Sequence, residues 1–277
     1  MDRDNAYQST ESVELYDAVF AGRDDGDFWR TVVAAGADPV LELGCGPGRV
    51  LLRLARAGHE VTGLDLSPHM IDFCRTRLRG ESDEVRDRVD LLVGDMTAFE
   101  LGRVFGAILV PFGGFQHLLT VEQQLACLER CAAHLRPGGR LVLDLLNADP
   151  APVAAGADDA RPAMAADAVE ESAPNAAAAG DVELTDGRRV GFSMTETGYR
   201  HADQCMTYEV VYDVVEADGS ARRLVEATTL RYIFRFELEH LLARAGFRLT
   251  ALYGDYDCSA FGEQSPALIA VAEREPA

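Results

Sequence analysis

Three glycines at alternating positions directly follow an apolar run, and this spacing predicts a ligand-binding turn. The run covers residues 40–43, and Gly44, Gly46 and Gly48 come after it. Glycine allows backbone conformations that a Cβ forbids, so a ligand can lie directly against the main chain. A dinucleotide site needs G-x-G-x-x-G, but Arg49 stands at its third glycine position. A phosphate-binding P-loop needs a lysine, which the chain lacks, so the pattern that remains is E-x-G-x-G-x-G.

Carboxylates stand at the ends of the next two apolar runs. Asp65 ends a strand predicted over residues 61–65, and Asp95 follows a strand that begins at Val89. A carboxylate can accept hydrogen bonds from both hydroxyls of a ribose, so we expect Asp65 to bind one. The alternative for Asp65 is a solvated position before the helix that Ser67-Pro68 opens. A Gly-Asp pair such as the one at Asp95 is by itself typical of a turn.

Together these residues resemble the class I S-adenosylmethionine-dependent methyltransferases, whose first motif has the form E-x-G-x-G-x-G. The resemblance implies S-adenosyl-L-methionine as cofactor and S-adenosylhomocysteine as product. It also implies that Asp95 lies near the adenine amino group and that Met96 lies against the ring. The residues that it implies for cofactor binding are Glu42, Gly44, Cys45, Gly46, Gly48, Asp65, Leu66, Asp95, Met96 and Val110.

Alternating strand and helix patterns predict the α/β class. Thr120 and Gln123 have the spacing of a capping box, which predicts a helix from there to about Leu135. A second helix is predicted from Glu237 until Gly246 ends it. The predicted strands are 40–43, 61–65, a third from Val89 that ends in Gly94-Asp95, 107–110, 140–145, 247–253 and 267–272. This order predicts a Rossmann-like, seven-stranded, mostly parallel sheet with helices on both faces.

Composition limits the classes of function. The 277 residues carry a net charge of −20 and a pI near 4.6, which argues against nucleic acid as a partner. No apolar run is long enough for a membrane span and the N-terminus is polar, so we expect a cytoplasmic protein without membrane partners. Six cysteines and six histidines show no metal-ligand spacing, so no metal is expected. The absence of lysine excludes Schiff-base chemistry.

The composition changes after Asn147, which predicts a division into domains. Residues 148–180 are rich in alanine and contain no aromatic residue, so we predict a flexible connector. Residues 181–234 contain three β-rich runs, over 189–197, 204–216 and 222–234, and a hairpin signal at Asp218-Gly219, so we predict an inserted antiparallel sheet. Tyr199 and Arg200 are then expected in the turn after the first strand, and Arg235 at the end of the third. The cofactor-binding core is then residues 1–147 and 235–277, with lid helices over residues 1–37.

The layout resembles sugar N,N-dimethyltransferases and glycine N-methyltransferase, which carry an insertion at this point as a lid or dimer surface over the acceptor. The resemblance implies methyl transfer to an N, O or C atom of a small-molecule acceptor by in-line displacement. It also allows a homodimer through the β insertion. The enzyme would mainly have to align donor and acceptor away from water.

Two residues are candidates for catalysis. His117 ends the stretch from Pro111, which resembles the Phe-Ser-Ser-x-x-[His/Tyr]-Leu stretch of sugar N-methyltransferases, although both serines are glycines here. Its imidazole suits proton transfer near neutrality. Tyr16 resembles the Tyr of a family Tyr-Asp pair in a segment that folds over the cofactor. The alternatives are a structural histidine before a helix and an aromatic residue that packs the lid.

Candidates for acceptor binding are Phe112, Tyr199, Arg200, Arg231 and Tyr253, with His201, Tyr232, Arg235, Asp255 and Tyr256 nearby in sequence. Arginines can clamp a phosphate or a carboxylate, although a solvated strand edge also explains them. Two alternatives therefore stay open: a C-methyltransferase of a prenyl diphosphate-like acceptor held by arginines, and a non-catalytic protein that binds S-adenosylmethionine.

Overall fold

The computed structural model describes residues 7–33, 37–147 and 182–275, which fall into two compact units. The core unit comprises Asp24–Asn147 and Ile233–Ala277, and the insert unit comprises Met1–Arg23 and Ala148–Tyr232. The predicted connector over 148–180 lies outside the described residues. No helix in the described ranges combines the length and the apolar character needed to cross a membrane.

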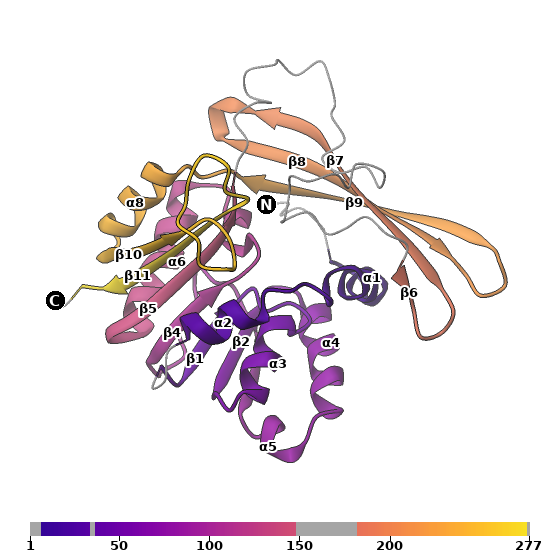
Figure 1. Ribbon diagram of the computed structural model, residues 1–277, viewed down its shortest axis with the longest axis horizontal. Coiled ribbons are helices and arrows are strands. Elements are labelled where there is room, and N and C mark those ends of the chain that lie inside the picture. Colours follow the sequence, from indigo (N-terminus) through magenta and orange to yellow (C-terminus); the bar gives the residue numbers. More distant parts are fainter. Residues whose placement is uncertain (1–6, 34–36, 148–181, 276–277) are drawn as a thin grey trace. The chain divides into compact units, whose positions relative to one another are not determined.

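The core unit is built on a seven-stranded sheet in the order β10-β11-β5-β4-β1-β2-β3 (Figure 1). Its strands are β1 (Val40–Leu43), β2 (Val61–Asp65), β3 (Val89–Val93), β4 (Phe105–Val110), β5 (Leu135–Leu146), β10 (Phe247–Tyr253) and β11 (Ala267–Arg274). Strands β1 to β5 pair in parallel, whereas β11 is antiparallel to both of its neighbours. The predicted α/β class and the mostly parallel sheet are therefore confirmed.

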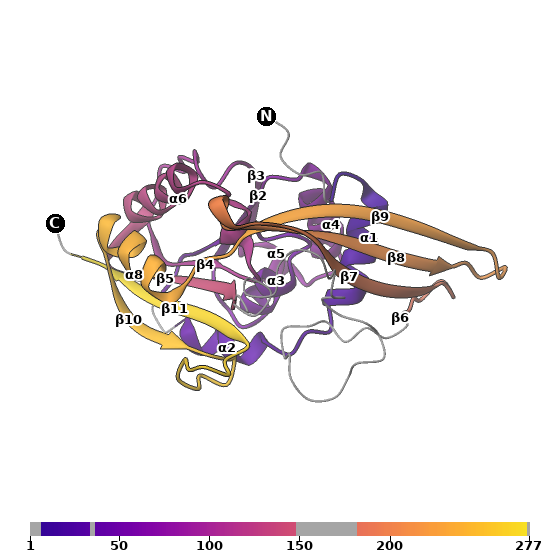
Figure 2. The same ribbon diagram turned by 90° about the horizontal axis from the view of Figure 1, so that it is seen from above.

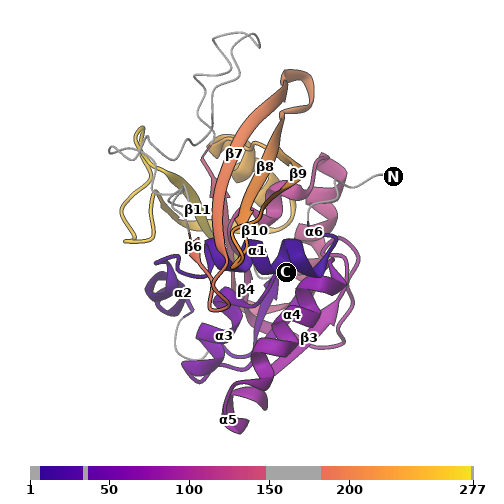
Figure 3. The same ribbon diagram turned by 90° about the vertical axis from the view of Figure 1, so that its right-hand side faces the viewer.

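Helices cover both faces of this sheet. Successive side chains of a central strand point to opposite faces, so they pack in two different hydrophobic clusters, one on each face. Leu41 and Leu43 of β1 pack in one cluster with helices α6 and α8, whereas Val40 packs in another with α2, α3 and α4. Figure 3 shows α4 beside β3, which it contacts. The helices are α2 (Gly26–Val32), α3 (Arg49–Arg56), α4 (Pro68–Arg79), α5 (Asp83–Arg86), α6 (Val121–His134) and α8 (Arg235–Arg244).

Local signals in the sequence set several of these helix ends. The Thr120 side chain accepts from the Gln123 amide while the Gln123 side chain accepts from the Thr120 amide, so the predicted capping box forms. The Ser67 hydroxyl caps α4 by accepting from the Met70 amide at 3.4 Å. Strand β5 begins at Leu135 rather than at the predicted Arg140, because a register shift lets the Pro-Gly-Gly segment join the strand.

The insert unit is a four-stranded antiparallel sheet in the order β6-β7-β8-β9, with helix α1 against it. Its elements are α1 (Thr10–Phe20), β6 (Val182–Glu183), β7 (Arg189–Arg200), η2 (His201–Asp203), β8 (Cys205–Val215) and β9 (Ala221–Arg231). Figure 2 shows β7, β8 and β9 running side by side. Leu15 of α1 is fully buried in one cluster with Phe192 and Tyr212. Helix α1 thus packs on the inserted sheet, whereas residues 1–37 were expected to belong to the core.

The ends of the inserted strands differ from the expected ones. Strand β7 continues through Tyr199 and Arg200, which were expected in a turn. Strand β9 ends at Arg231 instead of Phe234. Arg235 is therefore the first residue of α8 rather than the end of a strand, because Phe234 already occupies the N-cap position of that helix. The hairpin at Asp218-Gly219 is confirmed, with Gly219 at φ 85°.

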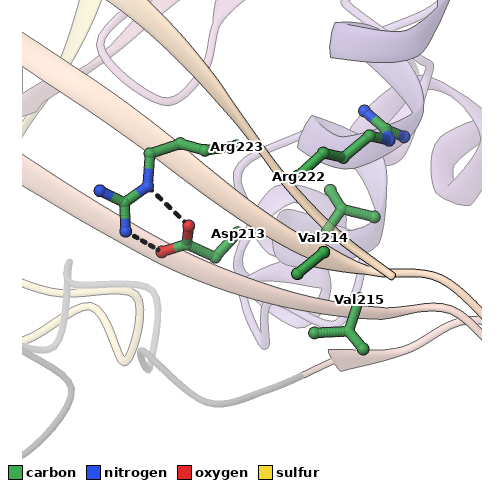
Figure 4. A pocket seen from close by; sticks show the side chains of 6 residues that line it. Asp213, Val214, Val215, Arg222 and Arg223 are labelled. Carbon is green, nitrogen blue, oxygen red and sulfur yellow. Dashed lines mark hydrogen bonds and ion pairs between the residues drawn. The ribbon is translucent and has the colours of Figure 1, made fainter. Parts of the chain in front are cut away.

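A shallow hollow lies near the hairpin that joins β8 and β9 (Figure 4). It contains a two-bond ion pair in which Arg223 donates to Asp213 at 2.7 and 3.0 Å. Such exposed pairs contribute little to stability. None of the residues predicted to bind a ligand lines this hollow, whose residues are Asp213, Val214, Val215, Ala221, Arg222 and Arg223.

Close packing at Gly63 in β2 generates a stability prediction. A Cβ there would lie 2.4 Å from Leu51 Cδ1 and 2.9 Å from Cys45 Sγ, and both side chains are buried. We expect Gly63→Ala to lower the free energy of unfolding by about 1–3 kcal/mol through overpacking, measured by urea denaturation. Gly262→Ala is the control, because no atom lies within 4 Å of its Cβ position. Equal losses in the two variants would contradict this packing.

Candidate active site

The sheet of the core unit reverses its strand order between β1 and β4. From β1 the chain continues outward through β2 to β3, whereas β4 and β5 lie on the other side. Ligands of open α/β sheets bind outside the carboxyl ends of the strands at such a reversal. The glycine turn follows β1, and the segment 111–117 follows β4. The two motifs singled out in the sequence therefore start from adjacent strands at the reversal point.

The three glycines of the turn have different physical roles. Gly44, Gly46 and Gly48 have φ angles of 66°, 52° and 88°, which L side chains rarely adopt. A Cβ on Gly48 would lie 2.5 Å from Cys74 Sγ, so this glycine allows α3 and α4 to pack closely. At Gly44 and Gly46 the nearest atoms are 3.7 and 3.8 Å away, so these two present uncrowded main chain. The turn can therefore hold a ligand against Gly44 and Gly46.

Asp65 connects the glycine turn to the end of β2. Its Oδ2 accepts from the Gly46 amide and its Oδ1 accepts from the Ser67 amide, both at 2.8 Å. Burial raises the pKa of Asp65, and hydrogen bonds from backbone amides oppose that rise. Each carboxylate oxygen has two lone pairs, so bonds to a ribose are compatible with these contacts. The carboxylate thus shapes the turn in addition to any contact with a ligand.

Glu42 is a buried acid without a partner for one oxygen. It lies in β1 with 2 % of its surface exposed, and its Oε2 makes no hydrogen bond. Burial raises the pKa of Glu42 to about 8, although nearby Arg49 lowers it. An unpaired buried carboxyl is costly, and a hydrogen-bonding cation would relieve that cost. The site is therefore suited to a ligand that carries an ammonium group.

A second buried acid, Asp25, joins the segment before α2 to the glycine turn. Its carboxylate is 1 % exposed and pairs with Arg49, the residue directly after Gly48. Arg53 Nη1 lies 3.4 Å from the same oxygen, and Trp29 Nε1 donates to the other at 3.2 Å. These contacts hold the first turn of α3 against α2. Asp25 and Arg49 were not among the predicted site residues, because nothing in their spacing indicates that positions 24 residues apart come together.

The other predicted cofactor residues also lie at carboxyl ends of strands. Asp95 Oδ1 accepts from the Thr97 amide at 2.9 Å and from the Thr97 hydroxyl at 2.8 Å, which is the turn geometry expected for Gly-Asp. Met96 Cε is the atom closest to the Cβ position of Gly44, so the end of β3 approaches the glycine turn. Leu66 is 52 % exposed beside Asp65 and offers an apolar surface.

Two of the predicted cofactor residues have buried side chains. Cys45 is 3 % exposed and Val110 is fully buried. Burial also raises the pKa of the Cys45 thiol. These residues can therefore meet a ligand only through their backbone.

The segment after β4 carries the expected acceptor residues of the core unit. Phe112 has φ 51°, which is unusual for a residue with a side chain, and Gly113 follows at φ 70°. His117 ends the short helix η1 (Gly114–His117) and is exposed. A serine in place of Gly113 would need a left-handed backbone, which explains one departure from the family stretch. Tyr253 is the last residue of β10.

The remaining predicted residues belong to the insert unit. The ring of Tyr16 in α1 packs on Tyr7 and Phe20, with centroids 4.9 and 4.8 Å away. The rings of Tyr199 and Tyr232 stack at 5.2 Å. Arg200 Nε donates to Asp203 at 3.1 Å, and Arg231 Nη2 donates to Gln204 at 3.1 Å. The predicted residues are thus divided between the two units. All the predicted cofactor residues lie in the core unit, and so do Phe112, His117 and Tyr253.

The described residues contain no group of three or more His, Cys, Asp or Glu side chains arranged to hold a metal ion.

Comparisons with known proteins match part of the core unit to a known family. Residues 40–139 match the family model described as a methyltransferase domain. The chain is 35 % identical over 145 residues to dTDP-3-amino-3,6-dideoxy-alpha-D-glucopyranose N,N-dimethyltransferase of Streptomyces fradiae, over 49 % of this chain and 53 % of that protein. It is 35 % identical over 125 residues to a ubiquinone biosynthesis O-methyltransferase of Xanthomonas campestris pv. campestris, over 45 % and 50 %. The chain thus spans about half the length of the curated relatives it matches.

Solved structures extend the likeness to the whole fold. The CcbJ methyltransferase from Streptomyces caelestis superposes with a TM-score of 0.73 at 24 % identity, over 100 % of both chains. SAM-bound CalS10, an amino pentose methyltransferase from Micromonospora echinaspora, gives a TM-score of 0.63 at 25 % identity, over 94 % of this chain and 96 % of that one.

The fold and the glycine turn at the reversal point define a Rossmann-like cofactor-binding domain. The matched family model identifies residues 40–139 as a methyltransferase domain, and the chain is similar to S-adenosylmethionine-dependent methyltransferases, among them sugar N,N-dimethyltransferases. The residues present fit the cofactor of this family. The uncrowded faces of Gly44 and Gly46 leave room against the main chain, and Glu42 Oε2 lacks the donor that an amino-acid ammonium group would supply.

The state of Glu42 generates a pH prediction. With a pKa near 8, the side chain is mostly protonated at pH 7, whereas the ammonium of S-adenosylmethionine favours the carboxylate. Binding should therefore release a proton, and affinity should rise with pH from 6 to 8 by at most about tenfold per unit. Calorimetry in two buffers of different ionisation enthalpy measures this release. The Glu42→Gln variant should bind S-adenosylmethionine more weakly and should no longer release the proton of Glu42. Identical proton release by the variant and the wild type would contradict the role assigned to Glu42.

The buried ion pair of Asp25 generates a stability prediction. Asp25→Ala leaves the buried Arg49 guanidinium without this partner, so we expect a loss of about 3–5 kcal/mol in the free energy of unfolding. Asp27→Ala is the matched control, because Asp27 pairs with Arg30 at a side chain that is 91 % exposed. Its removal should change stability by less than about 1 kcal/mol. Urea denaturation of both variants tests the difference, and a similar small effect in each would show that the buried pair is not needed.

Proposed function

We propose that this protein transfers a methyl group from S-adenosylmethionine to a nitrogen atom of a small-molecule acceptor. The observation that carries the proposal is the uncrowded turn at Gly44 and Gly46, flanked by the buried Glu42 and the partly buried Asp65 where the strand order reverses. A sulfonium donor with an amino-acid tail and a ribose matches these features: its ammonium group suits Glu42, its amino-acid end suits the glycine turn, and its ribose suits Asp65. The family match supports the same cofactor.

We assign each cofactor residue by its geometry. Glu42 would receive the ammonium group, and Gly44 and Gly46 would lie against the amino-acid end. Asp65 would accept from the ribose hydroxyls while its bonds to the Gly46 and Ser67 amides keep it in place. Leu66 and Met96 would flank the adenine, and Asp95 would accept from its amino group.

The bound cofactor supplies an electrophilic methyl group on a sulfonium sulfur. An acceptor amine would attack this carbon with its lone pair as the carbon–sulfur bond breaks, which leaves S-adenosylhomocysteine. The new ammonium group must then lose a proton. We assign this proton to the exposed imidazole of His117, which can pass it to water. A catalytic role for Tyr16, which belongs to the insert unit, stays a prediction from the sequence.

Nitrogen is the acceptor atom with most support. The matched protein of Streptomyces fradiae is named as a sugar N,N-dimethyltransferase, and CalS10 is described as an amino pentose methyltransferase. The ubiquinone O-methyltransferases are matched over a shorter part of the chain. We therefore expect an amino sugar or a similar hydroxylated amine. A homodimer through the insert unit stays an expectation for the oligomeric state.

A phosphorylated acceptor held by arginines has weaker support. Arg200 is paired with Asp203, Arg231 donates to Gln204, and Arg235 pairs with Glu239 at 2.9 Å. Each of these bonds would have to be exchanged for a bond to an anion. The arrangement therefore favours recognition of an amine over recognition of a diphosphate.

One experiment separates the cofactor half of the proposal from the acceptor half. Methyl transfer from labelled S-adenosylmethionine is measured with a free amino sugar, a dTDP-amino sugar and a prenyl diphosphate. Asp65→Ala should weaken cofactor binding by about tenfold or more, because it removes a partly buried charged acceptor. His117→Asn should lower kcat by about 100-fold with the cofactor Kd unchanged. Asp72→Asn, on the exposed face of α4, is the control for both.

The outcomes of this experiment are distinct. Transfer to either amino sugar supports the proposal, and transfer only to the diphosphate replaces it with the arginine-held acceptor. Cofactor binding without transfer to any acceptor would identify a non-catalytic binding protein. No binding of S-adenosylmethionine would overturn the proposal as a whole.

A further inference from the structure

Asp144 is a charged residue inside an otherwise apolar strand, and none of the cofactor contacts assigned above uses it. It lies in β5 within the sequence Leu141-Val142-Leu143-Asp144-Leu145 and is 2 % exposed. A charged side chain is almost never buried unless other groups bind it. The groups that bind Asp144 show what it does.

The carboxylate of Asp144 holds the turn that follows β4. Its Oδ2 accepts from the Phe112 amide at 2.8 Å, and its backbone carbonyl accepts from the Gly113 amide at 2.9 Å. These are the two residues with φ angles of 51° and 70°. A left-handed conformation at a residue with a side chain costs on the order of 1 kcal/mol or more, so the contacts around it must keep it in place.

The same segment is fastened a second time two residues farther along β5. The Gln116 side chain accepts from the Leu146 amide at 2.8 Å and donates to the Leu146 carbonyl at 3.3 Å. Gln116 is 1 % exposed, so the next residue, His117, is directed to the surface. Together, Asp144 and Gln116 determine where the segment 111–117 lies on the sheet.

A third element reaches the same oxygen of Asp144. Tyr256, in the loop after β10, donates its hydroxyl to Asp144 Oδ2 at 2.8 Å. Its ring packs edge-on against Phe28 of α2, with centroids 5.6 Å apart. The guanidinium of Arg49 lies 5.8 Å from the ring centroid of Phe112. The turn is thus linked to the helix that starts at the glycine turn and to the loop between the last two strands.

We propose that Asp144 is a positioning residue for the acceptor half of the reaction. It keeps Phe112 and Gly113 left-handed, and Tyr256 keeps the carboxylate in place. Through this turn, Asp144 determines the position of Phe112 and His117 without touching the cofactor or the acceptor. The kinetic part of this inference rests on the proposed function, whereas its structural part does not.

The kinetic test compares three variants that weaken the network by different amounts. Asp144→Ala removes the acceptor, Asp144→Asn keeps one neutral acceptor oxygen, and Tyr256→Phe removes one donor. We expect kcat to fall about 10–100-fold in Asp144→Ala, less in Asp144→Asn and least in Tyr256→Phe. The Kd of S-adenosylmethionine should change less than about threefold, because the donors that these variants affect, the Phe112 amide and the Tyr256 hydroxyl, belong to neither the glycine turn nor the assigned cofactor acids.

A matched control separates positioning from loss of stability. Val85→Ala removes two methyl groups from a buried side chain of α5, away from the segment 111–117. Its activity at a temperature well below its Tm should equal that of the wild type. An equal loss of kcat in Val85→Ala, or a parallel loss of cofactor affinity in Asp144→Asn, would overturn the proposal.

Relief of strain gives a more specific readout. Glycine adopts φ 51° without penalty, so a Phe112→Gly background needs Asp144 less. The fold-loss of kcat on adding Asp144→Ala should therefore be smaller in Phe112→Gly than in the wild type. An undiminished loss in the double variant would contradict the role assigned to the turn.

Hydrogen exchange tests the structural part without any activity. The amides of Phe112 and Gly113 should exchange faster in Asp144→Ala and in Tyr256→Phe, while those of β1 stay protected. If exchange is faster in these variants but the wild-type protein transfers no methyl group, the proposed function is refuted and the hydrogen-bond network of Asp144 is still supported. Unchanged exchange would refute the network itself.

Discussion

The burial of both faces of the central parallel strands is the constraint on which the rest of the structure depends. Strands β1 and β4 are buried along their whole length, and their side chains alternate between two hydrophobic clusters. Burial of apolar surface drives such a sheet to form. Polar groups can then be placed at the carboxyl ends of the strands, where the order reverses between β1 and β4. The glycine turn, Asp65, Asp95 and the segment 111–117 all lie at such ends.

The acids inside this apolar frame are bound in different ways, and the differences are informative. Asp25 is paired with Arg49 and Trp29, so it joins two helices. Asp144 accepts two neutral donors and holds a strained turn. Glu42 has an oxygen with no partner and a pKa near 8. A buried acid that lacks a partner in the protein is the one suited to a charged ligand.

The fold and the cofactor motif could be predicted from the sequence because both depend on short-range patterns. Largely apolar runs of about four to seven residues indicate the strands, and the capping box at Thr120 specifies the start of α6. The spacing of Gly44, Gly46 and Gly48 excludes the dinucleotide motif, and the lack of lysine excludes a P-loop. The partners of Asp25, Asp144 and Tyr256 could not be predicted, since their contacts join positions 24 to 112 residues apart. The helix α1 illustrates the same limit: its apolar face is visible in sequence, but its packing against β7 is not.

The sequence alone therefore determined the class of fold, the cofactor and the residues at the ends of β1, β2 and β3, because local conformation and alternation decide these features. Only the tertiary structure decided which residues surround them. It showed that Asp65 bonds to the glycine turn, that Arg49 is held by Asp25, and that Phe112 is kept left-handed by Asp144. These contacts depend on how the sheet brings distant segments together, and no spacing along the chain encodes that.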